Sequence, residues 1–362
     1  MMSVGANTTT RSGLERNRAL DATRTVALLG IIVLNYHGYL NRYDAIGANK
    51  ENFFARIMDA WNGVLAPSPV IFVLVSGISC ALLTSAQFDR WVLVRRGILL
   101  FAIGSMFEWV WNGTILPYFG LYFVLAAAVS AWSKRNIILV AVLCTTSAAV
   151  LSFWRFVREE DLYSTSWLSP AHPDSPRNFV FRYFVDYTHP VLPWFAFFCV
   201  GLLIGRSMPW FFANRARLFA PLVVGVIAVY TLSTVVRRST DGAWQRLTST
   251  DPFERGILAT VGVTLSSILV LIVVSWIIDA FPRSPIADVF VRAGQITLTL
   301  YVLHGLAYNL IVNQLDWVRP TGLDTALGLS AIMWIVLVAI GAWWNRFYGR
   351  GPLERLLRGF GG

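Results

Sequence analysis

The chain has 362 residues, of which 56% are hydrophobic and only 14% are charged, and its formal net charge is +10. This composition excludes an ordinary soluble globular protein and favours a single polytopic membrane domain. The positive charge is spread over short turns between apolar stretches, so it indicates membrane topology and contact with anionic lipids. Nucleic acid is therefore not an expected partner.

Ten apolar stretches separated by arginine-bearing turns organise the sequence. Because a hydrocarbon core about 30 Å thick needs roughly 20 apolar residues per helix, we predict an all-α membrane protein, a polytopic bundle of about ten transmembrane helices. The predicted spans lie near residues 25–40, 64–84, 97–111, 114–132, 136–154, 190–205, 218–236, 256–278, 293–312 and 325–344.

Basic residues on alternate turns predict the orientation of these spans. Clusters of arginine between the second and third spans and between the sixth and seventh place those turns in the cytoplasm under the positive-inside rule. We therefore expect a multi-pass protein of the plasma membrane with both termini in the cytoplasm. Residues 1–18 would form a cytoplasmic tail, 19–347 the transmembrane domain and 348–362 a basic cytoplasmic C-terminal tail.

The first span carries polar side chains on one face. At about 100° per residue, one stripe of this helix contains Asp21, Arg24, Leu28, Ile31 and Asn35. His37 falls on nearly the opposite face. One interpretation is an interfacial Asp21–Arg24 ion pair and an Asn35 that only joins helices. The other is a functional site, because an intramembrane Asn followed so closely by His is costly unless it is used.

The ninth span carries a second polar stripe at a similar depth. Helical spacing aligns Gly294, Thr297, Tyr301, His304 and Tyr308. A lone histidine on an apolar helix is usually a packing residue, whereas one on a continuous polar stripe indicates a cavity or a proton path. We therefore expect Asn35, His37, Tyr301 and His304 to approach one cavity.

Three further polar residues lie near the predicted outer ends of spans. Glu108 ends the third span, and Asp186 and His189 precede the sixth. Each is interpreted either as an interfacial or capping residue or as a contact for an acceptor substrate.

The three cysteines, Cys80, Cys144 and Cys199, each fall inside a predicted span. They are far apart and form no CxxC pair, so we expect neither disulfides nor a metal site. Apolar filling of the bundle is their predicted role.

Five blocks of the sequence together resemble the transmembrane acyltransferase superfamily. These blocks are LDATRTVALLGIIVLNYHG, SPVIFVLVSGISCALL with RRGILLFAIG, ILPYFGLYFVLAAA, DYTHPVLPWFAFFCVGLLIGR and AGQITLTLYVLHGL. The superfamily includes bacterial envelope-glycan O-acetyltransferases and heparan-alpha-glucosaminide N-acetyltransferase. The resemblance implies transfer of an acyl group, acetyl being expected, from cytoplasmic acyl-CoA to a hydroxyl or amine of an outer-face glycan or other small acceptor.

The first span departs from one branch of this superfamily. In the O-acetyltransferase branch an Arg is followed eleven positions later by a catalytic His, whereas here Arg24 is followed at that spacing by Asn35, as in the heparan-type branch. The heparan-type branch uses a His in the outer loop after this span, and residues 41–63 contain none. His37 is therefore the nearest candidate.

Acyl transfer requires a base and donors that hold the oxyanion. His37 is the predicted base. Asn35 is the predicted amide donor, with Tyr301 or Thr297 as a further donor, and His304 is a second base, a relay or a group that positions the thioester. No glycine-rich phosphate loop marks a nucleotide site, so the prediction of a CoA site rests on the resemblance. Arginines are the expected phosphate ligands, because guanidinium groups bind phosphate well. The predicted CoA-binding residues are Arg24, Arg95 and Arg96, and the predicted acceptor-binding residues are Glu108, Asp186 and His189.

Two rival functions fit the same sequence. A proton-coupled transporter or permease would use His37, His304 and Glu108 as a proton path, although we find no pair of matching broken helices in the two halves. A scaffold or sensor without chemistry would leave both polar stripes unexplained.

Overall fold

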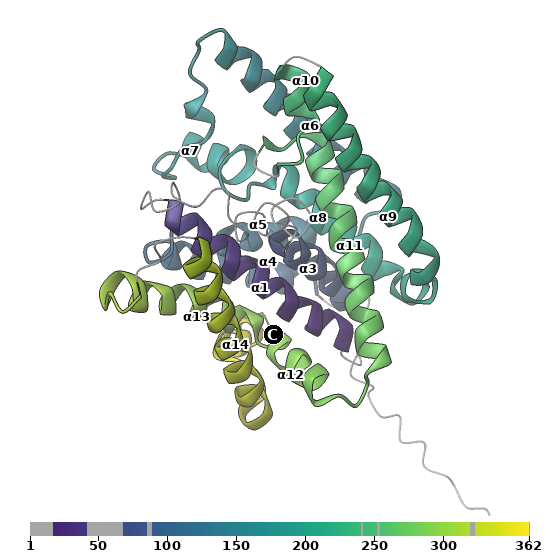
Figure 1. The fold of residues 1–362 in the computed structure, drawn as a ribbon, viewed down its shortest axis with the longest axis vertical. Helices are drawn as coiled ribbons and strands as arrows, with labels where there is room; N and C mark the ends of the chain where they lie inside the picture. Colours follow the sequence, from purple (N-terminus) through teal and green to yellow (C-terminus); the bar gives the residue numbers. More distant parts are fainter. Residues whose placement is uncertain are drawn as a thin grey trace, which may run out of the picture.

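The computed structural model describes residues 17–41, 68–84, 89–239, 242–251, 254–318 and 323–361, and every regular element in these ranges is helical (Figure 1). The elements of the first part are α1 (Arg18–Asn41), α3 (Ser68–Thr84), α4 (Trp91–Phe107), α5 (Leu116–Val129), α6 (Lys134–Glu160), η2 (Ser166–Leu168), α7 (Pro176–Val180) and η3 (Phe181–Val185). Those of the second are α8 (Val191–Arg206), α9 (Met208–Ser239), α10 (Gly242–Leu247), α11 (Ile257–Ala280), α12 (Pro285–Gly294), α13 (Thr297–Tyr308), η5 (Asn309–Gln314), α14 (Leu323–Tyr348) and α15 (Pro352–Gly361).

Helix lengths confirm an all-α membrane protein and correct the expected number of spans. Among the described residues, five helices are long and apolar enough to cross a membrane, or six if one bent pair counts as a single span. The helices α3, α5 and α8 have only 17, 14 and 16 residues, which at about 1.5 Å per residue is shorter than a hydrocarbon core of about 30 Å. The prediction of about ten spans is therefore not supported, because apolar character alone did not distinguish short inner helices from membrane-crossing ones.

The short helices pack against each other inside the molecule. Helix α3 lies against α8, and α4 lies against α5. A Cβ atom on Gly77 would collide with the backbone of α8, and one on Gly120 with the backbone of α4. Small residues allow these backbones to approach closely, as is common between helices in membranes.

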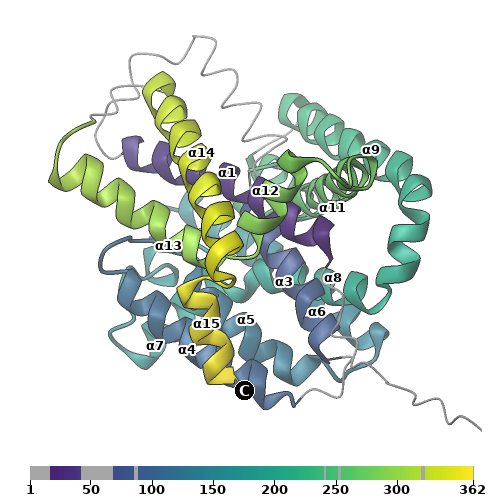
Figure 2. The same ribbon diagram turned by 90° about the horizontal axis from the view of Figure 1, so that it is seen from below.

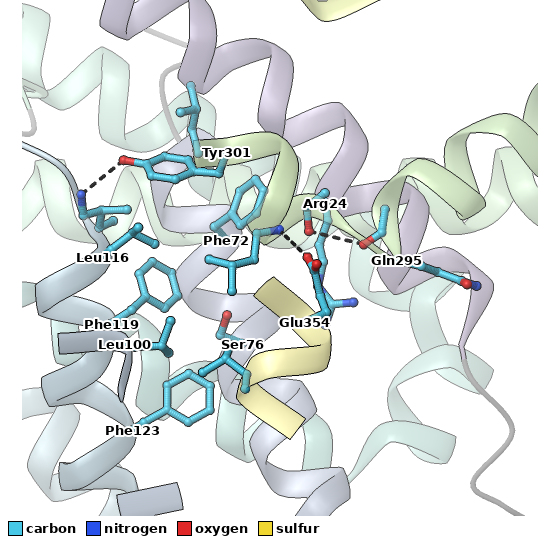
Figure 3. Close-up of a pocket in the computed structure, with 16 residues that line it drawn as sticks. Arg24, Phe72, Ser76, Leu100, Leu116, Phe119, Phe123, Gln295, Tyr301 and Glu354 are labelled. Atoms are coloured by element: carbon cyan, nitrogen blue, oxygen red, sulfur yellow. Dashed lines mark hydrogen bonds between the residues drawn. The ribbon is translucent and has the colours of Figure 1, made fainter. Parts of the chain in front are cut away.

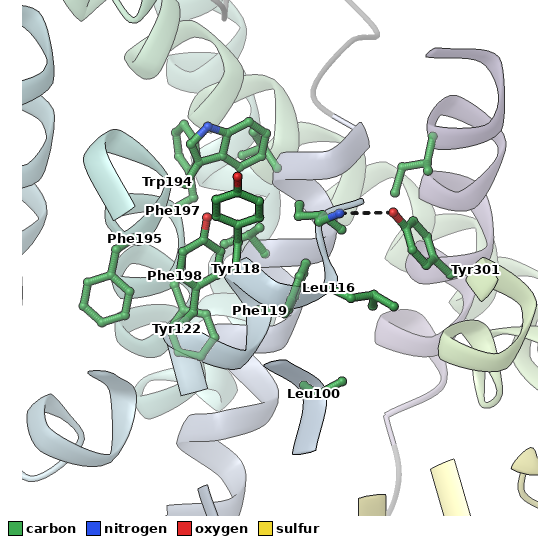
Figure 4. Packing of buried hydrophobic residues seen from close by; sticks show 14 of the residues in the cluster. Leu100, Leu116, Tyr118, Phe119, Tyr122, Trp194, Phe195, Phe197, Phe198 and Tyr301 are labelled. Carbon is green, nitrogen blue, oxygen red and sulfur yellow. Dashed lines mark hydrogen bonds between the residues drawn. The ribbon is translucent and has the colours of Figure 1, made fainter. Parts of the chain in front are cut away.

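Aromatic side chains fill the interface between α5 and α8 (Figure 4). Tyr122 lies 6.2 Å from Phe195, and Phe195 stacks on Phe198 with ring centroids 5.8 Å apart. Tyr118 is fully buried beside them. The three cysteines are also buried and free, in agreement with the predicted apolar role.

Helix α1 crosses the centre of the bundle and contacts α3, α11, α12, α13 and α14 (Figure 1). At its beginning the carbonyl of Asp21 lies so close to Gly294 that no Cβ would fit there. This contact between α1 and the end of α12 brings the two predicted polar stripes together.

The predicted continuous span 293–312 is in fact broken. Helix α12 ends at Gly294, α13 begins at Thr297, and the two axes differ by 81°. The polar residues expected on one stripe, apart from Gly294, therefore all belong to α13. The segment 348–362, expected to be a tail, contains α15, which packs on α4 and α13 (Figure 2).

Candidate active site

A largely apolar cavity of about 260 Å³ lies between α1, α3, α4, α5, α13 and α15. Figure 3 shows Tyr301 and Leu116 on one side of it, and Arg24, Gln295 and Glu354 on the other. The wall between these ends is apolar and includes Leu100, Phe119 and Phe123. The cavity thus joins a polar, charged end to an uncharged end that is closed by a tyrosine.

His304 lies one helical turn beyond Tyr301 and is completely buried. Its Nδ1 atom contacts the carbonyl oxygen of Tyr301, which can only accept, so Nδ1 carries the proton. The Nε2 atom lies 2.9 Å from Nδ2 of Asn35 and accepts a hydrogen bond from that amide. This arrangement is a neutral imidazole whose basic lone pair faces Asn35.

Aromatic rings enclose this amide–imidazole pair. Trp111 lies edge-on to His304 with ring centroids 5.5 Å apart, and Tyr36 is stacked 6.2 Å away. The Tyr36 hydroxyl donates a 3.1 Å hydrogen bond to the carbonyl of His304, and Tyr308 packs 4.5 Å from Tyr36. The enclosure lowers the local dielectric constant, which strengthens each hydrogen bond inside it.

The Tyr301 side chain ties the cavity to the turn between α4 and α5. Its hydroxyl lies 3.1 Å from the Thr114 hydroxyl and accepts a 3.2 Å hydrogen bond from the backbone N–H of Ile115. The same side chain lines the cavity, while its backbone carbonyl holds His304. Tyr301 is therefore the residue through which the cavity and the pair are connected.

The three predicted CoA-binding arginines lie in different surroundings. Arg24 lines the cavity, pairs with Asp21 at 2.6 Å and donates to Ser79 at 2.6 Å, so the ion pair that one interpretation of the first span included is present. Arg95 is exposed and 3.8 Å from Asp89. Arg96 is half-buried. Of the three, Arg24 is the one that the structure places on the cavity.

Two of the predicted acceptor-binding residues, Glu108 and Asp186, belong to a set of ion pairs, which we call the outer ion cluster because they lie near the predicted outer ends of spans. It contains Glu108, Arg155, Arg182, Asp186 and Arg255. Glu108 pairs with Arg182, whose side chain is almost fully buried and lies over the ring of Tyr187. Asp186, also buried, pairs with both Arg155 and Arg255.

His189 lies beside this cluster, in the segment before α8. Its backbone carbonyl accepts a hydrogen bond from Tyr122, and its ring is 4.5 Å from that of Trp194. The Nδ1 atom is buried and has no hydrogen-bond partner among the described residues. Burial lowers the pKa of His189 to about 3, so its imidazole is neutral. The described contacts of Glu108, Asp186 and His189 do not bring them to Asn35 and His304.

The structure also shows residues that the sequence did not single out. Tyr36 and Trp111 enclose His304, and Glu354 lines the cavity. The sequence could have indicated a role for Tyr36, because it directly follows Asn35 in the first span. Nothing in the sequence indicated a role for Glu354, which lies among arginines in the segment expected to be a tail. The side chain of His37, the predicted base, lies outside the described residues.

The fold and this geometry define an all-α membrane protein with a buried amide–imidazole pair beside an apolar cavity. Residues 16–234, more than half of the chain, match the family described as heparan-alpha-glucosaminide N-acetyltransferase, catalytic, and the chain belongs to this family. Residues 209–360 match a family described as a protein of unknown function (DUF418), which is related to transmembrane acyltransferases. A comparison with curated proteins gives no significant match.

The family matches confirm the resemblance predicted from the sequence. They also divide the site, since Asn35 lies in the first matched region and His304 in the second. The hydrogen bond between these residues therefore joins the two regions of the chain.

Proposed function

We propose that the protein is a membrane acyltransferase that moves an acyl group, acetyl in the first instance, from acyl-CoA to a hydroxyl or amine of a glycan or small acceptor. The observation that carries the proposal is the 2.9 Å contact between Asn35 and His304. An imidazole held as a neutral base next to an amide donor supplies both functions that acyl transfer needs.

In the proposed reaction the acceptor O–H or N–H gives its proton to Nε2 of His304 as the oxygen or nitrogen attacks the thioester carbonyl. The Asn35 amide, released from Nε2, donates to the oxyanion. Collapse of the tetrahedral intermediate breaks the C–S bond, and the proton passes from His304 to the CoA thiolate. The products are the acylated acceptor and free CoA. Tyr301 orients His304 through the carbonyl contact with Nδ1.

The shape of the cavity supports a direction for the donor. At the charged end, Arg24 is the candidate contact for a phosphate of CoA beside its ion pair with Asp21. The apolar wall suits the acyl and pantetheine groups, which would reach toward Tyr301. We propose that the end near Arg24 faces the cytoplasm, because the basic residues around the start of α1 favour that side under the positive-inside rule. Six spans, with the bent pair counted as one, would place both termini on that side of the plasma membrane. Arg95 and Arg96 are further candidates for phosphate contacts at this surface.

The acceptor would reach the pair from the opposite side. We retain Glu108, Asp186 and His189 as candidates for that surface, where the ion pairs of Glu108 and Asp186 would shape the acceptor site without taking part in proton transfer. The rival proton-coupled transporter gains no support from the family match, and its proposed relay residue Glu108 is already paired with Arg182.

The proposal is tested with purified protein in lipid nanodiscs and radiolabelled acetyl-CoA, measuring thioester consumption and labelled product from glucosamine-containing acceptors. We expect His304→Ala to lower turnover by about 10²–10⁴-fold, the usual contribution of a general base. If His37→Ala shows that loss and His304→Ala does not, His37 is the base. Undiminished turnover in the double mutant would refute the proposed site.

A further inference from the structure

The break between α12 and α13 exposes the first backbone N–H groups of the helix that carries His304. Helix α13 begins at Thr297, and the preceding helix leaves at an angle of 81°. The first N–H groups of any helix have no partner within it. In a buried position each of them needs an acceptor from elsewhere.

Glu354 supplies that acceptor from the C-terminal helix. Its Oε1 atom accepts from the backbone N–H of Leu298 at 2.8 Å and of Thr299 at 3.1 Å, and its Oε2 atom accepts from the Thr299 hydroxyl at 2.6 Å. The backbone N–H of Leu353 in turn donates to the Thr299 hydroxyl at 3.3 Å. Four hydrogen bonds thus join α15 to the first turn of α13.

Close packing supports this junction. A Cβ atom on Gly351, directly before α15, would collide with the Glu354 carboxylate and the Thr299 hydroxyl. A carboxylate at a helix N-terminus also interacts favourably with the helix dipole, and hydrogen bonds to a charged group are stronger than neutral ones. The first turn of α13 is therefore held by geometry and by charge.

We infer that Glu354 is a positioning residue for the site, an inference that rests on the proposed function. It fixes the first turn of α13, and the next turn carries Tyr301, whose carbonyl orients His304. Glu354 and Leu357 also line the cavity. The C-terminal helix is thus a structural part of the donor cavity and acts on His304 through α13.

A simpler role would be that Glu354 only anchors α15 to the bundle. The two roles differ in what happens when the carboxylate is removed. Loss of an anchor would free α15 and leave α13 unchanged, whereas loss of a positioning residue would loosen α13 between Thr297 and His304.

Hydrogen–deuterium exchange of the full-length protein in nanodiscs separates these roles without an activity measurement. We expect Glu354→Ala to increase exchange about 10–100-fold in peptides covering 297–304, the factor for losing hydrogen bonds to a charged group. Glu354→Gln keeps one acceptor oxygen but loses the charge, so its exchange should lie between those of wild type and Glu354→Ala. The control is Leu356→Ala, whose side chain is exposed on the same helix. Increased exchange confined to 352–361 in Glu354→Ala would overturn the inference.

Kinetics with labelled acetyl-CoA provide the second measurement. In Glu354→Ala we expect kcat to fall about 10–100-fold while KM for the donor changes little. A small displacement of a reacting group such as His304 lowers the rate of the chemical step. Glu354→Gln, which keeps one acceptor oxygen, should restore part of kcat. A change confined to KM would assign Glu354 to donor binding and overturn the positioning role.

Two further outcomes need separate treatment: absence of acyl transfer in the wild-type protein, and failure of Glu354→Ala to fold. If the wild-type protein transfers no acyl group, the proposed function fails, while the exchange measurement still decides whether Glu354 holds α13. If Glu354→Ala does not fold, Thr299→Val removes one partner of the same carboxylate. It should then increase exchange in 297–304 to a smaller extent, and unchanged exchange would overturn the inference.

Discussion

The Asn35–His304 pair and the outer ion cluster are both buried polar groups, but the first is satisfied by hydrogen bonds between neutral groups and the second by ion pairs. The pair is uncharged and held by one amide and one backbone carbonyl, and the basic nitrogen of His304 accepts a hydrogen bond from Asn35. The outer ion cluster neutralises Asp186 with Arg155 and Arg255. Buried charges must be paired, and such pairs stiffen a region but are expensive to disturb. On the proposed function, the uncharged pair would carry the chemistry and the ion pairs would hold the fold together.

Removing the shared carboxylate of the outer ion cluster should have the largest effect on stability. Asp186→Ala leaves Arg155 and Arg255 without this partner and should destabilise the fold by about 3–5 kcal/mol, the usual effect of breaking a buried ion pair. The fraction of monodisperse protein surviving a heating series in detergent measures this loss. Glu160→Ala, at an exposed position of α6, should change survival little. Equal survival of both variants would contradict the structural role of the cluster.

Disturbing the central pair should affect catalysis more than folding. Asn35→Ala removes the amide donor, and we expect turnover to fall about 10²-fold, as for the loss of one oxyanion donor. Stability should fall by only about 1–3 kcal/mol, the effect of leaving a buried hydrogen-bonding group unpaired. Turnover and thermal survival are measured on the same preparation, with the exposed Asn136→Ala as control. Turnover equal to wild type would make Asn35 a packing residue.

The Tyr301 hydroxyl offers a finer comparison within the site. Tyr301→Phe removes the contacts to Thr114 and Ile115 but keeps the backbone carbonyl that holds His304. We expect a stability loss of about 1 kcal/mol and a change in turnover of a few fold. A loss of turnover as large as that of His304→Ala would instead show that the hydroxyl takes part directly in the reaction.

The smallest expected effect is a dependence of stability on pH caused by His189, which lies beside the outer ion cluster. The pKa of His189 falls from 6.5 to about 3 on folding, because burial disfavours the imidazolium. Below pH 6.5 the unfolded chain therefore binds a proton that the folded protein excludes, so stability should decrease as the pH falls from 6.5 toward 3. His189→Gln should flatten this part of the thermal-survival curve, while His172→Gln, at an exposed position, should not. Identical slopes would remove His189 as a source of pH dependence.

Local patterns predicted the parts of this protein that depend on local chemistry. Apolar runs located the helices, and helical spacing put Asp21 and Arg24 within reach of each other. Asn35 does contact His304, but the depth argument that predicted this assumed an unbroken helix across residues 293–312. The resemblance located the family. These inferences succeeded because burial and helical periodicity depend on neighbouring residues.

Long-range contacts decided the rest. The contact of Gly294 with Asp21, the break before Thr297, and the reach of Glu354 to α13 all join segments distant in sequence. The same holds for the arginines that pair with Glu108 and Asp186. A charged residue in a buried segment needs a partner, because burying an unpaired charge is costly. The sequence shows that the partner is needed. Which residue supplies it depends on how the helices pack, and neighbouring residues in the chain do not determine that.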